Sequence, residues 1–542
     1  MARDLKADQA MLREVLAYAQ NRDFQRAGAI AGQALASGFE HPLLLNVVAT
    51  CKELEGKFEE ALRYLERAVE LVPGDIGARN ALALCLQRLD RPADALYHVD
   101  LLLKDHPELG FAHANKGNAL IALGWLGRAR ASHLRALELE PANIAAMASL
   151  ASIASHNGNH DEARSWAEKV LAAVPNFPDA VISLAAAELA SGGAARAEAL
   201  IRPLLADERV AAPDRARAHG LLGDVLDAIG RYPEAFAHYK ACNDGLRQVY
   251  RRFAGGPGLA AYTHLLTEAV KATPQGNSDG SSDSEAPGAL GHVFLLGFPR
   301  SGTTLLEAVL EGHPRVVSAD ELELLTEAVY RFMGDRPDLD ALARADETEL
   351  RALRRAYWER VRQAEIEVAG KVFVDKYPLN TLKLPLIARL FPNAKILFAC
   401  RDPREVVLAC FRRRFKMNAA MYELLTLPGA AALYDAVMAF AEAMRPKFGA
   451  RWYGVRYESL IADFDRQTRA ICEFLGLEWV EGMDDVAGRA RARERSTPST
   501  AQLARGLDRS RAEHWRHYAG PLQPVLPTLN RWVERFEYSA AK

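Results

Sequence analysis

The first half of the 542-residue chain repeats every 34 residues, and this period constrains its fold more than any other feature of the sequence. An alanine keeps the spacing at Ala27, Ala61, Ala95, Ala129, Ala163 and Ala197, and Ala235 follows after a four-residue insertion near 205–213. Glycines keep it at Gly56, Gly124, Gly158 and Gly192, with Asp90 in the slot between the first two, and prolines at Pro73, Pro107, Pro141 and Pro175. The period predicts an array of helical hairpins, each burying its apolar side against its neighbours.

Each of the three residue types has a physical role in such a hairpin. The glycine or its substitute is expected to allow close approach of two helices. The alanine lies early in the second helix and is small where the two helices cross. The proline ends each unit, because it cannot continue a helix. A helical bundle with accidental periodicity is the alternative.

The combined pattern resembles the tetratricopeptide repeat. The resemblance implies seven units between about residues 8 and 248, stacked into a right-handed all-α solenoid over residues 1–250. Such a solenoid has a concave face, and arrays of this kind mostly bind peptides or other proteins. We therefore expect the repeat groove to dock a peptide or protein, either a partner or the substrate. A purely structural or oligomerising role is the alternative.

Composition indicates a soluble globular protein, with 49% apolar and 25% charged residues. The formal net charge of −2 gives no indication of a nucleic-acid partner. Six scattered cysteines show no metal-ligand spacing and are expected to be buried thiols in a reducing cytoplasm. The start, MARDLKADQA, has no apolar leader, and no apolar run reaches membrane-spanning length, so a cytoplasmic protein without a membrane span is expected.

Residues 251–289 are expected to connect the repeats to a second domain at 290–542. The segment RRFAGGPGL at 251–259 breaks the last helix, and a short helical pattern follows at 260–272. The polar segment 274–288 has no apolar anchor and is predicted to be a flexible linker.

The second domain alternates short apolar runs with helical patterns. Strands are expected at 293–296, 372–374, 395–400 and 452–455, and helices at 302–311, 379–390, 403–415 and 465–475. This alternation predicts an α/β fold with a parallel sheet, right-handed crossovers, and ligands at the carboxyl ends of the strands.

The first predicted strand leads into a Gly-x-x-x-x-Gly loop, read as VFLLGFPRSGTTLLEAVL at 293–310. A strand, such a loop and a helix in this order are typical of a phosphate-binding P-loop. A nucleotide triphosphatase would carry lysine after the second glycine, whereas Gly302 is followed here by Thr303 and Thr304. The one nearby cation, Arg300, precedes that glycine.

Two segments of the domain, PRSGTT at 299–304 and ILFACRDPREVVLACFRRRF at 396–415, carry a recognisable pattern. They resemble the 5′-phosphosulfate loop and the 3′-phosphate-binding strand and helix of sulfotransferases. Later segments of the family match RWYGVRYESL at 451–460 and STPSTAQ and HWRHY within 496–518. The resemblance covers essentially all of 290–540 and points to the branch of tyrosylprotein sulfotransferases and of bacterial proteins that join tetratricopeptide repeats to a sulfotransferase. It implies a P-loop-kinase-like fold and 3′-phosphoadenosine 5′-phosphosulfate (PAPS) as sulfuryl donor, with no metal.

Two anionic ends of such a donor would need two binding sites. For the 5′ end, the resemblance implies Gly302, the hydroxyls of Ser301, Thr303 and Thr304, and Arg300, which is also expected to act in catalysis by pairing with the transferring sulfuryl group. For the 3′-phosphate it implies Arg401, with Arg413 twelve residues on along the same helix. The family usually has a serine where this chain has Ala409, and Cys410 is a poor substitute. We expect Arg412 and Arg414 to be an exposed basic run.

The family's catalytic residues can be placed as well. Glu321, beside Asp320, matches the base that takes the acceptor proton, and Lys376 matches a lysine that stabilises charge on the bridging oxygen. Ser499 would be a hydroxyl partner near the same oxygen. Tyr457 matches a tyrosine that contacts the nucleotide, with a core aromatic as the alternative. His514 stands where the tyrosylprotein branch has a lysine, just before Trp515.

The sequence therefore predicts transfer of a sulfuryl group from PAPS to a hydroxyl acceptor, plausibly tyrosine in a peptide or protein. Alternatives are a carbohydrate or small-molecule acceptor, a P-loop small-molecule kinase, and a non-catalytic repeat scaffold.

Overall fold

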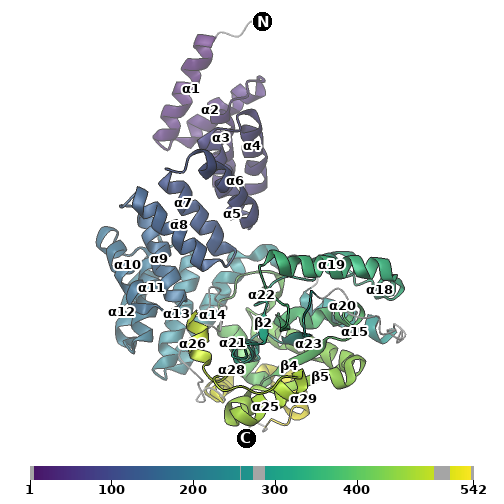
Figure 1. Ribbon diagram of the computed structural model, residues 1–542. Coiled ribbons are helices and arrows are strands. Elements are labelled where there is room, and N and C mark those ends of the chain that lie inside the picture. Colours follow the sequence, from purple (N-terminus) through teal and green to yellow (C-terminus); the bar gives the residue numbers. More distant parts are fainter. Residues whose placement is uncertain (1–4, 257, 273–286, 493–512, 539–542) are drawn as a thin grey trace. The chain divides into compact units, whose positions relative to one another are not determined.

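The computed structural model describes residues 5–256, 258–272, 287–492 and 513–538. The chain divides into two compact units, Met1–Leu184 and Ala185–Lys542 (Figure 1). The division falls within helix α11 (Pro178–Ala190), so the repeats contribute to both units. Most of the predicted linker at 274–288 lies outside the described residues.

The first unit is built from five helical hairpins. Their helices are α1 (Leu5–Gln20), α2 (Phe24–Ala36), α3 (Pro42–Leu54), α4 (Phe58–Leu71), α5 (Ile76–Arg88), α6 (Pro92–Asp105), α7 (Gly110–Ala122), α8 (Leu126–Leu139), α9 (Ile144–His156) and α10 (His160–Ala173). A turn of three residues joins the two helices of each pair. In the second unit, α11 and α12 (Ala194–Ala206), and α13 (Ala212–Ala228) and α14 (Tyr232–Val249), form two more hairpins, which makes seven helical hairpins among the described residues.

The structure explains why three residue types keep the period. The periodic alanines all lie in the second helix of a hairpin and are fully buried, from Ala27 to Ala235. The prolines follow the second helices, as predicted. The role predicted for the glycines is wrong: at Gly56, Gly124, Gly158 and Gly192 a side chain would meet no atom within 4 Å, and each residue has a φ of 76–82°. Glycine ends the first helix in the left-handed conformation there, and Asp90 adopts it too, with φ 58°.

The second unit continues from α14 through η1 (Arg251–Gly255) and α15 (Leu259–Ala272) into the α/β domain. The last repeat packs directly on that domain. Asn243 donates a hydrogen bond to the Phe411 carbonyl at 2.8 Å, and Cys242 and Leu246 share an apolar cluster with Met417 and Leu425. These contacts place the last repeats in one compact unit with the α/β domain, although the sequence pattern changes only at 250.

The sheet has five parallel strands in the order β2-β3-β1-β4-β5. Their bounds are β1 (Gly291–Gly297), β2 (Val316–Ser318), β3 (Val372–Lys376), β4 (Lys395–Cys400) and β5 (Trp452–Arg456). The four predicted strands are confirmed, and the fifth, β2, was missed because it has only three residues. An all-α repeat array, followed in the sequence by an α/β domain with a parallel sheet, confirms the predicted fold class.

Helices cover both faces of this sheet (Figure 1). Alternate side chains of β1 explain the two layers: Val293 and Leu295 pack in a core with α16 (Thr303–Leu310) and α25 (Phe464–Leu475). Phe294 contacts the ring of Tyr357, from α19 (Glu347–Gln363), and the ring of Phe391. Strands buried on both faces are typical of parallel sheets.

The predicted helices are present with one correction. The pattern at 379–390 forms η2 (Pro378–Lys383) and α20 (Leu384–Leu390), and the pattern at 403–415 forms α21 (Pro403–Arg412). The prediction that Arg413 lies on this helix is therefore wrong, because Arg413 follows the end of α21. The other helices are α17 (Thr326–Phe332), α18 (Leu339–Arg344), α22 (Ala419–Glu423), α23 (Leu427–Phe448), η3 (Gly449–Arg451), α24 (Tyr457–Ala462), α26 (Val486–Ala492), η5 (His514–Tyr518), α28 (Ala519–Leu522), η6 (Gln523–Val525) and α29 (Leu526–Arg535).

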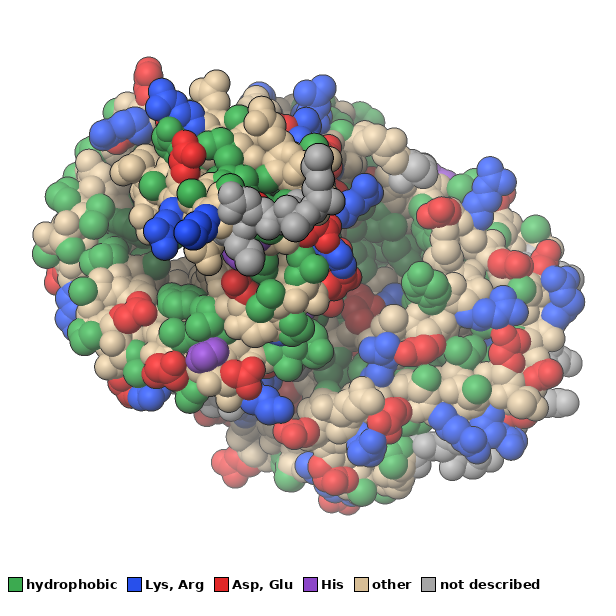
Figure 2. Space-filling view, turned by 90° about the horizontal axis from the view of Figure 1, so that it is seen from above, with side chains coloured by type: hydrophobic (Ala, Val, Ile, Leu, Met, Phe, Trp, Pro, Cys, Tyr) green, Lys and Arg blue, Asp and Glu red, His purple; other side chains and the backbone are tan. Residues whose placement is uncertain are grey.

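Positive and negative side chains are interspersed over the face shown in Figure 2. Five of the six cysteines are buried, Cys51 is half-buried, and all six are free thiols. Among the helices that the structure describes, none combines the length and the apolar character needed to cross a membrane.

Candidate active site

The predicted site residues follow the carboxyl ends of the strands. The loop predicted to bind phosphate, called the phosphate loop below, follows β1, Lys376 ends β3, Arg401 follows β4 and Tyr457 follows β5. All strands are parallel, so these ends meet at one edge of the sheet, where ligands bind in open α/β folds. The sheet topology thus brings residues more than 150 positions apart into one region.

The phosphate loop is held in an unusual backbone conformation. Arg300 has φ 70°, and Gly302, the N-cap of α16, has φ 103°. The loop is anchored at its start, where Thr381 donates to the Gly297 carbonyl at 2.9 Å. Ser301 is buried, and its hydroxyl has no hydrogen-bond partner among the described residues. A buried hydroxyl at a helix N-terminus is suited to an anionic ligand.

Gly302 provides a test of this loop. A Cβ at this position would lie 2.8 Å from Cδ2 of Tyr457, on a backbone that side chains rarely adopt. We expect Gly302→Ala to lower the free energy of unfolding by about 1–3 kcal/mol, measured by urea denaturation. Gly454→Ala is the matched control, because no atom lies within 4 Å of its Cβ, and it should change stability by less than about 0.5 kcal/mol. Equal stability of the two variants would contradict the described loop conformation.

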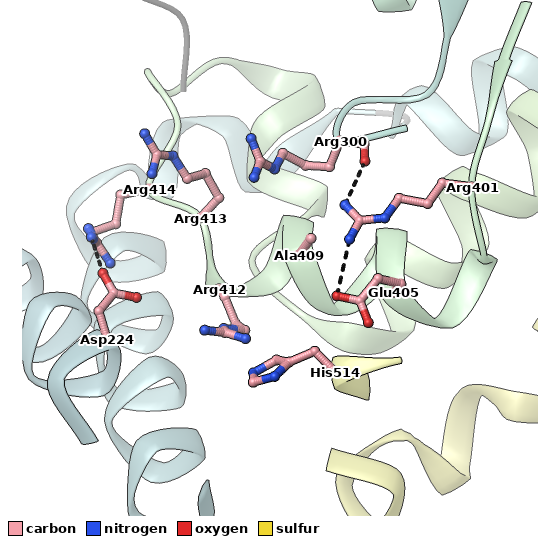
Figure 3. Close-up of a pocket in the computed structure, with 9 residues that line it drawn as sticks. All are labelled: Asp224, Arg300, Arg401, Glu405, Ala409, Arg412, Arg413, Arg414 and His514. Atoms are coloured by element: carbon pink, nitrogen blue, oxygen red, sulfur yellow. Dashed lines mark hydrogen bonds and ion pairs between the residues drawn. The ribbon is translucent and has the colours of Figure 1, made fainter. Parts of the chain in front are cut away.

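An arginine-lined pocket lies beside the loop (Figure 3). It has a cavity volume of about 90 Å³ and is lined by Asp224, Arg300, Arg401, Glu405, Ala409, Arg412, Arg413, Arg414 and His514. Arg401 donates to the Arg300 carbonyl at 3.4 Å, lies 3.6 Å from a Glu405 oxygen and stacks on the ring of Tyr457 at 4.6 Å. The structure thus brings together Arg300, Arg401 and Arg413, three residues that the sequence assigned to two different ends of a donor.

Arg413 is the exceptional cation of this pocket. Within the described part of the chain, no carboxylate forms an ion pair with it, and its Nε is buried without a partner. Burial, together with the neighbouring charges of Arg300 and Arg414, holds the pKa of Arg413 well below its ordinary value. A bound anion would supply the missing counter-charge.

The neighbours of Arg413 were predicted incorrectly. Arg412 and Arg414 are not an exposed run: Arg412 binds Asp227 and Arg414 binds Asp224, each at 2.6 Å. The remaining departures from the family pattern also lie here. Ala409 lines the pocket without a hydroxyl, and Cys410 donates instead to the carbonyl of Pro299 at 3.4 Å. His514, in place of a lysine, bonds through Nε2 to Asp227 at 2.8 Å.

A second cluster forms at the end of β3. The ladder between β2 and β3 continues past the strand, since Ala319 N–H donates to the Val374 carbonyl at 2.9 Å and Glu321 N–H to the Lys376 carbonyl at 2.8 Å. Lys376 Nζ consequently lies 2.8 Å from Asp320 Oδ1 and 2.9 Å from Glu321 Oε1. Asp320 and Glu321 both have positive φ, 30° and 58°. Such strain is concentrated at functional sites of proteins.

Sequence reasoning missed a further member of this cluster, Glu307. Its carboxylate is fully buried on α16, 3.3 Å from Lys376 Nζ and 2.8 Å from the hydroxyl of Ser318. Burial alone would lower the pKa of Lys376, but Glu307, Asp320 and Glu321 together raise it above its ordinary value. The signal available in the sequence was one acid inside the apolar segment TTLLEAVL.

The remaining predicted site residues lie in or beside the start of α16, except one that falls outside the described residues. Thr303 and Thr304 are buried at the start of α16, and Tyr457 lies between Arg401 and Gly302. Ser499 lies outside the described residues. Among the residues that the structure describes, no group of three or more His, Cys, Asp or Glu side chains is arranged to hold a metal ion.

The fold and the site define an α/β domain with a parallel sheet and an arginine-lined pocket beside the loop that follows β1. Residues 292–481 match a family model described as "Sulfotransferase family", and 54–114, 115–178 and 182–242 match models of the tetratricopeptide repeat. The chain therefore carries a sulfotransferase-family domain that follows a tetratricopeptide-repeat array in the sequence.

Individual relatives are distant. An uncharacterized protein of Aquifex aeolicus (strain VF5) is 26% identical over 417 residues, which cover 74% of this chain and 52% of that protein. Protein-tyrosine sulfotransferase 2 of Gallus gallus is 28% identical over 194 residues, 34% of this chain and 51% of that protein. The chain thus spans about half the length of these curated relatives.

Solved structures resemble each half of the chain. The sulfotransferase domain from the Synechococcus PCC 7002 olefin synthase is 21% identical with a TM-score of 0.36, covering 47% of this chain and 96% of that domain. A tetratricopeptide repeat protein from Parabacteroides merdae ATCC 43184 is 21% identical with a TM-score of 0.36, covering 44% of this chain and 92% of that protein.

Proposed function

We propose that the sulfotransferase domain transfers a sulfuryl group from PAPS to a hydroxyl acceptor, plausibly a tyrosine in a peptide or protein. The observation that carries the proposal is Arg413, a cation with no acidic partner among the described residues, in a pocket with Arg300 and Arg401 beside a phosphate loop that lacks lysine. PAPS has a 3′-phosphate as well as a 5′-phosphosulfate, and in this proposal the arginine pocket and the neighbouring loop would bind these two groups.

The residues divide between the two ends of this donor. Backbone N–H groups at the start of α16 and the hydroxyls of Ser301, Thr303 and Thr304 would bind the 5′-phosphate. Arg401 and Arg413 would bind the 3′-phosphate, and Arg300, located between the two, could serve either group. Tyr457 stacks on Arg401 and fixes the orientation of that guanidinium.

The chemistry would be carried out by the cluster at the end of β3. When bound, PAPS supplies the sulfuryl group, which the acceptor oxygen attacks as the bond to the phosphate oxygen breaks. In this proposal the Glu321 carboxylate accepts the acceptor's proton, and the Lys376 ammonium offsets negative charge on the departing oxygen. The observed contacts add a second role for Lys376, which holds Glu321 in place at 2.9 Å.

The acceptor that we propose is the hydroxyl group of a tyrosine. Several relatives are protein-tyrosine sulfotransferases, which supports tyrosine. We further propose that the concave groove of the repeats docks the peptide or protein that carries it.

Incubation of the protein with PAPS labelled in the sulfuryl group and a cell extract, followed by identification of the labelled molecules, tests the proposal. We expect label on tyrosine residues of proteins, and label incorporated at least about 100-fold more slowly with Glu321→Gln. Label on a sugar or small molecule would refute the tyrosine acceptor alone. The absence of label from every extract would refute the transferase activity.

A further inference from the structure

The arginine pocket is bordered by a helix of the last repeat. After α21 ends at Arg412, the backbone becomes extended at Arg413, with φ −92° and ψ 134°. Side chains alternate in extended chain, so Arg412 and Arg414 are directed away from Arg413. In Figure 3, Arg414 extends to Asp224, Arg412 lies beside His514, and Arg413 extends away from both.

Two acids on α13 receive the outer arginines. Asp224 and Asp227 are three residues apart and therefore lie on one face of the helix, about 4.5 Å apart along its axis. Alternate residues of an extended chain are about 7 Å apart, a difference that flexible arginine side chains can span. Asp224 binds Arg414 and Asp227 binds Arg412, each at 2.6 Å.

Further contacts fix the two acids. Tyr239, on the neighbouring helix α14, donates to Asp224 at 3.0 Å, and Tyr518 donates to Asp227. Burial alone would raise the pKa of Asp227, but His514, Arg412 and Tyr518 lower it to about 2. Asp227 is thus ionised near neutral pH and joins three segments: α13, the end of α21 and η5.

We propose that Asp224 and Asp227 are positioning residues of the donor pocket. By holding Arg412 and Arg414 on one side of the chain, they direct the guanidinium of Arg413 to the place where a 3′-phosphate would bind, an inference that rests on the proposed function. Helix α13 of the last repeat then lines the donor pocket, in addition to its place in the repeat array that is proposed to dock the acceptor.

The effect of removing these acids distinguishes positioning from simple charge balance. If the acids only offset positive charge, replacing them with asparagine would strengthen binding of an anion, because the pocket gains net positive charge. If they position Arg413, the same replacement weakens binding of a 3′-phosphate. The two mechanisms therefore predict opposite signs.

Isothermal titration of the full chain with 3′-phosphoadenosine 5′-phosphate and with AMP, which differ only in the 3′-phosphate, measures that sign. For Asp227→Asn we expect affinity for the bisphosphate to fall about 10-fold and affinity for AMP to change less than about 2-fold. The milder Asp224→Asn, at a half-exposed carboxylate, should show the same selectivity with a smaller loss. Asp244→Asn, which changes the same charge beside Lys240 on α14, should alter neither affinity.

A double-mutant comparison tests whether the acids act through Arg413. In an Arg413→Ala background, Asp227→Asn should have no further effect on the affinity for the bisphosphate. Unchanged or tighter binding by both single Asn variants would overturn the inference, and so would an equal loss for AMP and for the bisphosphate. Failure of the unmutated protein to bind the bisphosphate would overturn the proposed function instead.

Discussion

Glu321→Gln should reduce kcat for sulfuryl transfer by about 10²–10⁴-fold, because a carboxamide cannot accept the proton of the acceptor hydroxyl. Glu321 is well placed for this role. It follows the short strand β2, and its N–H donates a hydrogen bond to the Lys376 carbonyl. Its side chain is 33% accessible to solvent, so an acceptor can reach the carboxylate. The variant should bind 3′-phosphoadenosine 5′-phosphate with unchanged affinity, since Glu321 is not one of the residues that line the arginine pocket.

The matched control is Glu323→Gln. Glu323 is two residues further on, more exposed, and paired with Lys383 at 2.6 Å. Steady-state kinetics with labelled donor should show kcat within about 3-fold of the unmutated protein for this control. A Glu321→Gln variant that kept activity comparable to the Glu323→Gln variant would contradict the assignment of Glu321 as the base.

Lys376→Met should lower the free energy of unfolding by about 3–5 kcal/mol at neutral pH. The substitution removes the cation shared by Glu307, Asp320 and Glu321, and both Lys376 and Glu307 are fully buried. An unpaired buried carboxylate is strongly unfavourable, so the cost arises from the charges left behind. The same variant should be inactive, since it removes the cation that is proposed to offset charge on the departing oxygen and that holds Glu321 at 2.9 Å.

The loss should depend on pH in a definite direction. In the unmutated protein the pKa of Lys376 is raised by folding, so its stabilising contribution is fully present at neutral pH and is lost only as the pH rises through its folded pKa. In Lys376→Met the desolvated carboxyl groups would instead acquire raised pKa values. Their destabilising effect is present above those values and disappears as the pH falls, because the protonated carboxyl is neutral.

Urea unfolding at about pH 5 and about pH 8 measures this difference, and Lys376→Met should be less destabilised at the lower pH. Lys240→Met is the control, since the Lys240–Asp244 pair lies on an exposed helix surface, and its effect should stay below about 1 kcal/mol at both pH values. A Lys376→Met variant as stable as this control at pH 8 would contradict the described carboxylate cluster.

Local and periodic features of the sequence predicted most of the fold. The spacing of the alanines marks a fully buried position in the second helix of every hairpin. Strands β1, β3 and β4 were visible as apolar runs because they are buried on both faces. β2 was not visible, because three residues carry no period, although its register with β3 is what brings Glu321 to Lys376.

Contacts between distant segments account for what the sequence did not predict. An Arg-Arg-Arg run is usually a solvated surface, and only the fold shows that Asp224 and Asp227, nearly 190 positions earlier, bind two of its members. Glu307 was overlooked for the same reason, since its partner Lys376 is 69 positions further along. The role of the periodic glycines was misjudged because a left-handed turn and a close helix contact both select glycine, and only backbone angles separate them.

We propose that the pocket beside the phosphate loop binds a nucleotide with a 3′-phosphate. Competitive titration of the protein with 3′-phosphoadenosine 5′-phosphate in EDTA, and with ATP in Mg²⁺, tests it most directly. We predict that the bisphosphate in the absence of metal binds at least about 10-fold more tightly than ATP with Mg²⁺. Arg401→Ala or Arg413→Ala should remove this preference. Tighter binding of ATP with Mg²⁺, unaffected by either substitution, would contradict the account and favour a P-loop kinase.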